Sequence, residues 1–165
     1  KGDEFVSNNV LLAIGRRGTP RKLGVPGEDT SKVAYRLIEA EQIKGKKVIV
    51  VGGGDSAIES ALLLMDNNEV ILSYRKDKFS RLKPKNRDKI LEAEEQNKIN
   101  VMYNTNLVSI NEEDVLINSS ETGDTISVRN DLVYIFAGGE LPTKFLNNAG
   151  VEIKKRFGYV MKKHS

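Results

Sequence analysis

The sequence contains no cysteine, which excludes a disulfide scaffold, a thiolate zinc site, an iron–sulfur cluster held by this chain and a cysteine nucleophile. It has a single histidine, His164, which is the residue before last. A histidine-based catalytic triad and a histidine metal cage are therefore excluded as well. No apolar run approaches the roughly 20 residues that a membrane-spanning helix needs, so we expect neither a transmembrane protein nor a membrane partner.

The sequence also has no large excess of one charge. Its 165 residues include 26 Lys and Arg against 23 Asp and Glu, a formal charge of +3. This balance argues against a histone-like nucleic acid binder, and the length favours one ordinary domain with a hydrophobic core. The polar start Lys1–Phe5 does not resemble a signal peptide, so we expect a cytoplasmic setting. The chain begins without Met, and we expect it to be a piece of a longer protein.

The first 45 residues predict a strand, a connector and a short helix. The apolar run Val10–Ile14, closed by Gly15, is typical of a short strand buried on both faces. Arg16–Glu28 combines prolines and glycines with basic residues, which predicts a connector with turns. The apolar residues that follow are expected to line one side of a short helix ending before Gly45: Val33, Tyr35, Leu37 and Ile38.

A strand, a helix and a second strand follow over a stretch of about 30 residues. The β-branched run Lys47–Val51 predicts a fully buried strand of a parallel sheet, and Gly52–Gly54 end it at once. Asp55 and Ser56 then open a helix whose apolar residues surround most of its circumference. Glu69–Tyr74 is the second strand, and the crossover should be right-handed.

The second half of the chain first repeats this alternation and then changes period. Pro84 at the first turn predicts a helix over Lys85–Asn97. The apolar run Val101–Tyr103 predicts a third strand, and the run Leu132–Phe136 predicts a last buried strand. Between them, three short runs divided by turn residues predict an antiparallel meander: Leu107–Ile110, Val115–Ile117 and Thr125–Val128. We therefore predict an α/β fold, a Rossmann-type doubly wound parallel sheet with a three-stranded antiparallel β-meander.

The glycines after the first parallel strand fit the pattern G-x-G-x-x-A between a strand and a helix. Gly52 permits the tight turn, Gly54 lacks a Cβ and lets a pyrophosphate approach the backbone, and Ala57 lets helix and strand pack closely. The N-terminus of the helix then offers unpaired N–H groups to the phosphates. We favour dinucleotide binding over the alternative that the glycines only make a turn.

A second signal lies about 20 residues further on, where proteins that bind NAD usually place an acidic residue for the ribose hydroxyls. Here the second strand ends in Tyr74, Arg75 and Lys76 without a carboxylate. Arg75 and Lys76, with Arg81 nearby, would neutralise a ribose 2′-phosphate, which favours NADP(H) over NAD(H). The alternative is a solvated basic loop, because residues 75–89 carry eight basic side chains; no aromatic interleaving supports nucleic acid binding.

Three motifs, each in its expected place along the chain, carry a resemblance to a known family. They are Gly52–Ala57 with Tyr74–Lys76; Ala13–Gly15 with Pro20–Arg21 and Val25–Glu28; and Asp131–Tyr134 through Ala137–Gly139 to Pro142–Thr143. Together they resemble the NADPH domain of the thioredoxin reductase-like flavoproteins, the pyridine nucleotide-disulfide oxidoreductases with two dinucleotide-binding domains. The likeness covers nearly the whole chain.

The resemblance implies a site for NADPH across the carboxyl ends of the parallel strands. The pyrophosphate would lie over the glycine turn, and the adenosine phosphate would lie at the basic cluster. The loop after the last strand would border the same site. The cofactor-binding residues that we predict are Gly52, Gly53, Gly54, Asp55, Ser56, Ala57, Glu59, Tyr74, Arg75, Lys76, Arg81, Ala137, Gly138 and Gly139. Glu59 matches a family Glu near the nicotinamide; it is equally well explained as an ordinary exposed helical residue.

The sequence departs from the family at several positions. The thioredoxin reductase C-x-x-C pair would fall within Val33–Ile38, where no cysteine occurs, so disulfide reduction through that pair is excluded. The family's basic cluster usually begins with His where Tyr74 stands, and its later Arg is displaced by one position from Arg81. The amino-terminal FAD motif is missing. FAD would therefore be bound only by the full-length protein, through another part of the same chain.

The resemblance also divides the chain. Residues 1–28 would be a strand and connector of a flanking FAD-type domain, 29–140 the NAD(P)H-binding domain, and 141–165 the return towards the FAD-type domain. The expected function is to position NADPH for hydride transfer to flavin. We expect the isolated chain to be inactive. The sequence does not identify the electron acceptor, and a homodimer is compatible with the family. The alternative is a freestanding NAD(P)-responsive module; a methyltransferase-like reading is disfavoured by the basic strand end.

Overall fold

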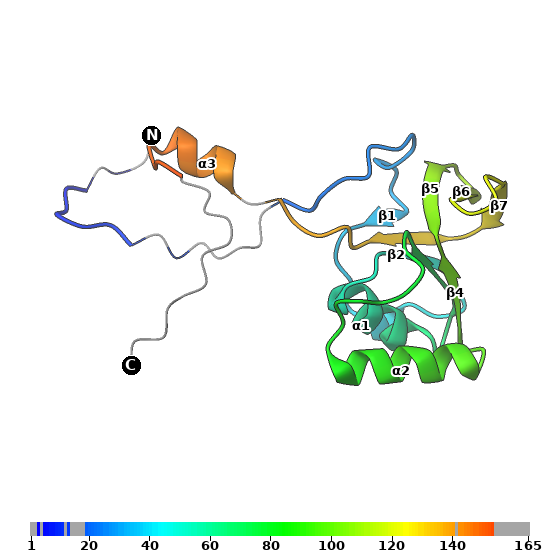
Figure 1. Ribbon diagram of the computed structural model, residues 1–165. Coiled ribbons are helices and arrows are strands. Elements are labelled where there is room, and N and C mark those ends of the chain that lie inside the picture. Colours follow the sequence, from blue (N-terminus) through cyan, green and yellow to red (C-terminus); the bar gives the residue numbers. More distant parts are fainter. Residues whose placement is uncertain (1–2, 4, 12, 14–18, 141, 154–165) are drawn as a thin grey trace. The chain divides into compact units, whose positions relative to one another are not determined.

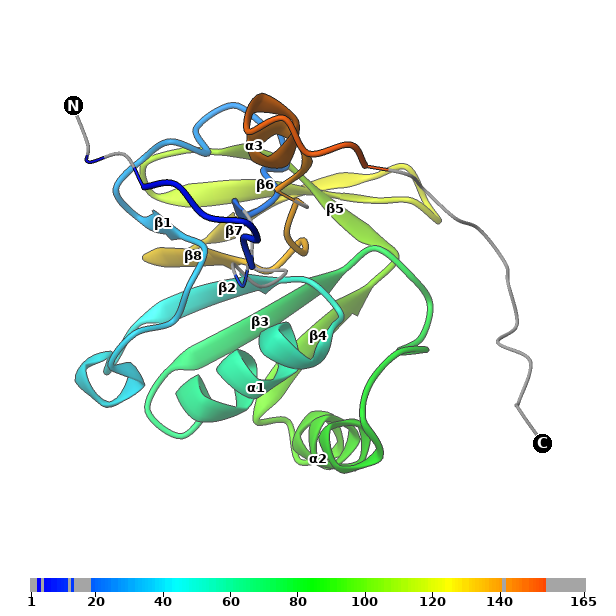
Figure 2. The ribbon, with the colours of Figure 1, turned by 90° about the vertical axis from the view of Figure 1, so that its left-hand side faces the viewer.

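The computed structural model describes residues 3, 5–11, 13, 19–140 and 142–153. The chain divides into two compact units: residues 20–138 form one, and residues 1–19 with 139–165 form the other. Figure 1 shows the helices α1 (Asp55–Leu64) and α2 (Pro84–Glu95) of the unit 20–138, and Figure 2 also labels its strands β3 (Glu69–Tyr74) and β8 (Leu132–Ile135).

The unit 20–138 is built on a parallel sheet with the strand order β1-β8-β2-β3-β4. Its strands are β1 (Val33–Ala34), β8 (Leu132–Ile135), β2 (Lys47–Val51), β3 (Glu69–Tyr74) and β4 (Ile99–Tyr103). From β2 the chain builds the sheet in one direction through β3 and β4, and it later adds β8 on the other side of β2. The predicted strands of this sheet are confirmed, as is the doubly wound α/β class.

One face of the sheet is covered by helices α1 (Asp55–Leu64) and α2 (Pro84–Glu95), which run below β2, β3 and β4 in Figure 2. α2 begins at Pro84, whose ring fixes φ and whose missing N–H is not needed in the first helical turn. Val48 and Val50 of β2 point to this side, where they are buried with Ile58 and Leu64 of α1.

The antiparallel meander covers the opposite face. Its strands are β5 (Thr105–Ile110), β6 (Asp114–Ser119) and β7 (Thr125–Arg129), in the order β5-β6-β7. Ile49 points to this side, opposite to its neighbours in β2, and packs in a second core cluster with Val115 and Ile117. β2 is therefore apolar on both faces because it lies between two cores, as a central strand of a three-layer structure requires.

The short helix predicted from Val33, Tyr35, Leu37 and Ile38 is wrong. Val33 and Ala34 form the edge strand β1, paired in parallel with Val133 and Tyr134. A 3₁₀ turn, η1 (Ala40–Gln42), follows. The apolar side chains of this segment alternate between the two cores, Val33 and Tyr35 joining the meander side and Ala34 and Leu37 the helix side. An extended chain produces that alternation, whereas a helix would gather them on one side.

The connector before β1 is held together by a buried carboxylate and is joined to the meander by a backbone hydrogen bond. Glu28, which is 7% exposed, accepts hydrogen bonds from the N–H groups of Leu23 (2.7 Å) and Gly24 (2.6 Å) and from the Tyr35 hydroxyl (2.9 Å). Ile110 N–H donates to the Pro26 carbonyl at 2.9 Å. The connector therefore belongs to the unit 20–138, although the sequence grouped residues up to 28 with a flanking domain. The assignment of the flanking segments to an FAD-type domain stays a prediction.

The other unit contains one described helix, α3 (Thr143–Asn148), which was not predicted. The strand predicted at Val10–Ile14 falls partly outside the described residues; Val10 and Leu11, which are described, are exposed and have no regular secondary structure. In the described part of the chain, no helix combines the length and the apolarity that crossing a membrane requires.

Candidate nucleotide-binding site

The turn after β2 lies where the sheet changes its direction of winding. Phe136, directly after β8, donates its N–H to the Val51 carbonyl at 2.7 Å, and Gly52 donates to the Ser73 carbonyl of β3 at 3.0 Å. The carboxyl ends of β2, β3 and β8 therefore meet around Gly52. In open α/β sheets, ligands bind outside the carboxyl ends of the strands at such a switch point.

The first two glycines of this turn are required by the protein itself. Gly52 has φ of +140°, and a Cβ there would lie 2.6 Å from the Phe136 carbonyl oxygen and 3.1 Å from the Ala57 Cβ. Ala57 is fully buried, as the close packing of helix on strand requires. At Gly53 a Cβ would lie 2.0 Å from the ring of Tyr74. Neither position can take a side chain unless its surroundings move.

Gly54 has no such structural reason to be glycine. Its φ is −102°, which any residue adopts, and a Cβ built there meets no atom within 4 Å. The residue is exposed. The open space beside Gly54 is what a phosphate group would use in approaching the backbone.

Gly54 is also the N-cap of α1, and no side chain caps this end of the helix. Within the described residues, the backbone N–H groups of Gly54, Asp55 and Ser56 have no hydrogen-bond acceptor. Ser56 is exposed beside them. An uncapped N-terminus of a helix of this length offers donors and a partial positive charge to an anion.

Asp55 opens α1 as predicted, but its side chain bonds to α2. Its Oδ1 accepts the Lys83 N–H at 3.0 Å and the Asn86 Nδ2 at 2.7 Å. Asn86 also donates to Glu59 Oε1 at 2.8 Å. The hydrogen bond from Asn86, followed by that from the Lys83 N–H, lowers the pKa of Asp55 below its ordinary value, so the carboxylate is charged at neutral pH.

The predicted basic cluster lies on a loop that is held by buried side chains. Arg75, Lys76 and Arg81 are exposed, whereas Phe79 and Leu82 between and beside them are 8% and 6% exposed. Within the described part of the chain, the three cationic side chains have no hydrogen bond or ion pair. They remain available to a ligand, and the loop backbone that carries them is anchored.

Tyr74 is part of the packing beneath this loop. Its ring is buried, covers Gly53 and stacks on Phe79 with centroids 5.0 Å apart. Phe79 in turn meets Tyr103, at 5.4 Å. The aromatic stack links the glycine turn to the start of the basic loop. A direct contact of Tyr74 with a cofactor stays a prediction.

The predicted residues after β8 lie at the edge of the unit. Ala137 is half-buried against the meander core, and Gly138 is exposed with φ of +91°, its carbonyl accepting the Arg21 N–H at 3.0 Å. Gly139 already belongs to the other unit. Ala137 and Gly138 thus join the glycine turn at one end of the sheet, because β8 pairs directly with β2.

The hollows found in the structure lie elsewhere. One of about 600 Å³ runs between α1 and α2 and is lined by residues such as Leu63 and Lys89. Another of about 910 Å³ lies between residues 30–32 and the turns of the meander. Residues of the glycine turn line neither hollow, and the space beside Gly54 is open. Asn86 lines the first hollow, and sequence reasoning missed this residue because its partners are about 30 positions earlier in the chain.

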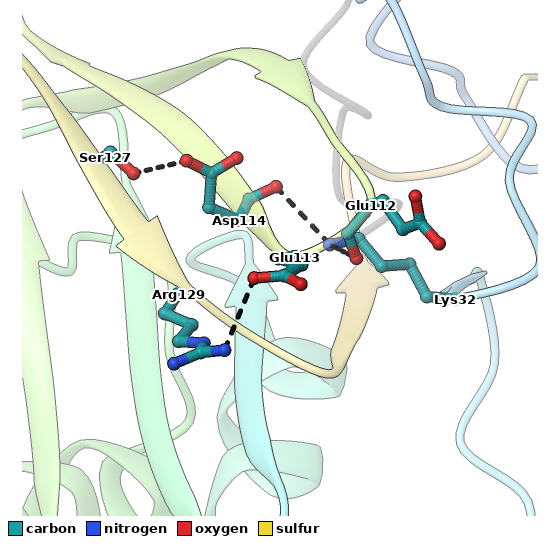
Figure 3. A network of polar contacts seen from close by, with 6 residues as sticks. All are labelled: Lys32, Glu112, Glu113, Asp114, Ser127 and Arg129. Atoms are coloured by element: carbon teal, nitrogen blue, oxygen red, sulfur yellow. Dashed lines mark hydrogen bonds and ion pairs between the residues drawn. The ribbon is translucent and has the colours of Figure 1, made fainter.

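A second polar cluster lies at the amino ends of the strands, away from the glycine turn, and Figure 3 shows it. Lys32 Nζ donates to the carbonyls of Glu112 (3.2 Å) and Asp114 (3.3 Å) and to Asn130 Oδ1 (3.1 Å). Nearby, Arg129 pairs with Glu113 at 3.3 Å, and Ser127 donates to the Asp114 carboxylate. Burial is the main cause that lowers the pKa of Lys32. The bonds made by Lys32 join the segment before β1 to the meander.

Known proteins similar to this chain are reductases. The bacilliredoxin reductase Bdr of Bacillus subtilis is 31% identical over 158 residues, which are 94% of this chain and 48% of that protein. The ferredoxin–NADP reductase of Thermus thermophilus is 27% identical over 164 residues, 94% of this chain and 49% of that protein. The chain spans about half the length of these curated relatives.

Solved structures and a family profile agree with these relatives. The bacillithiol disulfide reductase Bdr (YpdA) of Staphylococcus aureus is similar with a TM-score of 0.78 at 28% identity, over 84% of this chain and 43% of that one. The family profile of the pyridine nucleotide-disulphide oxidoreductases matches residues 1–164. The resemblance drawn from the three ordered motifs is confirmed at this level, and the chain belongs to the pyridine nucleotide-disulphide oxidoreductase family.

Proposed function

We propose that this chain is the NADPH-binding part of an FAD-dependent oxidoreductase and that it positions NADPH for hydride transfer to flavin. Gly54 is the observation that carries the proposal. It is a glycine with an ordinary φ and open space around it, at the uncapped N-terminus of α1. A ligand that must come close to the backbone explains a glycine that the protein's own packing does not need.

The residues around the turn suit the two phosphate groups of NADPH. The pyrophosphate would be held by the N–H groups of Gly54, Asp55 and Ser56 at the start of α1. The ribose 2′-phosphate would be held by Arg75, Lys76 and Arg81, which are exposed and have no partner within the described residues. NADPH supplies a hydride when it is bound. The part of this chain is to bind and orient the nucleotide.

The relatives support the reaction class. Two similar curated proteins are reductases, and one of them has NADP in its name. Because this chain spans about half of their length, flavin binding, the electron acceptor and any homodimer remain proposals about the whole protein. A cytoplasmic setting likewise stays a prediction. The described residues contribute no cysteine, so a thiol-reducing step would have to use a group outside this chain.

Calorimetric titration with NADPH and NADH tests the proposal. Changing Arg75 and Lys76 together to Ala should weaken NADPH binding at least tenfold, because charge-assisted hydrogen bonds to the 2′-phosphate contribute about 1.5–3 kcal/mol. NADH binding should change little. Lys44→Ala with Lys98→Ala is the matched control, since it removes the same two charges at the other end of the sheet. Equal losses for the two nucleotides would refute the 2′-phosphate assignment.

Gly54→Val tests the turn independently. The variant should fold, because the added side chain meets no atom of the protein, with a cost of about 1 kcal/mol for a poor N-cap residue. It should lose binding of both nucleotides. Circular dichroism checks the fold. Unchanged affinity in a folded Gly54→Val protein would remove the proposed phosphate site.

A further inference from the structure

Asn86, Asp55 and Glu59 form a group between α1 and α2 next to the proposed phosphate site, and Asn86 has so far been given no role. Asn86, in the first turn of α2, is 8% exposed and donates to Asp55 at 2.7 Å and to Glu59 at 2.8 Å. Both acceptors are carboxylates on α1, one turn apart. The amide orientation of Asn86 is therefore fixed, because its oxygen in the same place would face two negative charges.

Asp55 is an anion beside a site for anions. It is the first residue of α1, directly after the N-cap Gly54, where a carboxylate is attracted to the unpaired N–H groups of its own helix. If it turned towards them it would compete with a bound phosphate and repel it. In the structure its Oδ1 is instead held on the α2 side by Asn86 and by the Lys83 N–H at 3.0 Å.

We propose that Asn86 is a positioning residue that keeps the Asp55 carboxylate away from the anion position at the N-terminus of α1. It does so with a neutral donor, so the site gains no extra cation that would bind phosphate on its own. Its second N–H holds Glu59, which fixes the first two turns of α1 against α2. This inference rests on the proposed function, since it assigns Asn86 a part in binding the nucleotide's phosphates.

Asn86 would act on another part of the nucleotide than Arg75 and Lys76. Those cations would recognise the 2′-phosphate, which NADH lacks, whereas the pyrophosphate is common to both nucleotides. Removing Asn86 should therefore weaken NADPH and NADH by the same factor, and selectivity between them should not change. The same loss should be reversed when Asp55 becomes neutral.

The experiment compares four forms of the full chain by calorimetric titration with NADPH and with NADH: wild type, Asn86→Ala, the double variant Asn86→Ala with Asp55→Asn, and the control Asn68→Ala. Asn68 also donates two hydrogen bonds from its amide, to the carbonyls of Ile43 (2.8 Å) and Leu64 (2.9 Å), but at the far end of α1. Asn86→Ala should bind both nucleotides about tenfold more weakly, as a unit charge a few ångströms away in largely solvated surroundings would cause. The double variant should recover most of that loss, and Asn68→Ala should bind like wild type.

The outcomes distinguish the two proposals. If wild type binds neither nucleotide, the proposed function fails. If wild type binds but Asp55→Asn does not rescue the Asn86→Ala protein, the role of Asn86 is only structural and this inference is overturned. A loss confined to NADPH would also overturn it. Thermal unfolding of each variant verifies that the protein titrated is folded.

Discussion

At residue 53 the side chain that glycine lacks would enter space already taken by the ring of Tyr74. At residue 54 the same side chain would meet nothing. The spacing G-x-G-x-x-A assigns the approach of a pyrophosphate to Gly54, but it gives no reason for a glycine at 53. The pattern could predict the turn, the place of Ala57 and the role of Gly54, and the approach of a phosphate to Gly54 stays a prediction. The contact with Tyr74 depends on a residue of the next strand.

Gly53→Ala and Gly54→Ala should therefore differ in stability. The methyl group at 53 forces the Tyr74 ring off its stack with Phe79, which should lower the free energy of unfolding by about 1–3 kcal/mol. Gly54→Ala should cost about 1 kcal/mol or less, as a weaker N-cap. Urea unfolding of the two variants measures the difference. Equal costs would mean that Tyr74 does not pack on Gly53.

Glu28 should make the protein sensitive to acid. Burial raises its pKa, but the hydrogen bonds from Leu23, Gly24 and Tyr35 outweigh that effect, and the pKa lies below its ordinary value of 4.5. A carboxyl group whose pKa is lower in the folded state stabilises the fold above about pH 4.5, and this contribution is lost as the pH falls through the lowered pKa. Burial is the main cause that raises the pKa of Tyr35 to about 12, and its hydrogen bond to Glu28 adds to the increase.

Glu28→Gln should thus lower the free energy of unfolding by about 1.5–3 kcal/mol at pH 7, where wild type has charge-assisted hydrogen bonds. The difference in the free energy of unfolding between the two proteins should narrow as the pH falls below 4.5, because Glu28 of the unfolded wild type takes up a proton there while the folded carboxylate resists it. Urea titrations at pH 7 and pH 3.5 provide the comparison. A gap that is independent of pH would show that the charge of Glu28 does not matter.

Among the elements, those with a clear hydrophobic period were predicted almost to their ends. β3 begins and ends at the predicted residues, and α2 begins one residue earlier, at Pro84 itself. The failure at β1 has a physical reason. A strand of two residues has no period of its own, and it exists because Val133 and Tyr134, about 100 positions later, offer a free edge to pair with. α3 carries no buried residue in the structure, so its sequence has no apolar stripe from which a helix could be predicted.

The segment before β1 depends on Lys32, whose ammonium group has three acceptors on the meander and its neighbouring turn. Lys32→Met keeps the aliphatic stem and removes the charge and the donors, which leaves the buried Asn130 side chain without its Lys32 partner. The free energy of unfolding should fall by about 1.5–3 kcal/mol. Lys44→Met, at an exposed lysine, serves as the control and should change stability by about 0.5 kcal/mol or less. A similar small effect at Lys32 would contradict its role.

For the whole molecule, the family could be predicted from three motifs, and the profile match over residues 1–164 confirms it. The interaction of Asn86 with α1 could not, because it requires α1 and α2 to lie side by side with their N-termini at one edge of the sheet. Motifs identify what a chain contains. The hydrogen bonds of Asn86 to Asp55 and Glu59 can be seen only when the positions of α1 and α2 on the sheet are known.

The chain by itself should bind NADPH without oxidising it. Its proposed task ends at positioning the nucleotide, and the flavin would be held elsewhere in the whole protein. Absorbance at 340 nm, followed with NADPH and ferricyanide as artificial acceptor, should stay constant at the uncatalysed rate. NADPH oxidation that increases with the concentration of this chain, with no flavin added, would contradict the proposal that this chain only binds and positions the nucleotide.

The two ends of the unit 20–138 lie close together, because the Arg21 N–H, one residue from the start, donates to the Gly138 carbonyl at 3.0 Å. A short peptide linker can therefore close this stretch into a ring without stretching a strand, and new ends can be opened at a surface turn such as 120–124. The unit with its natural ends left open has a different use, because those two ends lie close together. It can be inserted as one piece into a loop of another protein, with both ends entering through a single position.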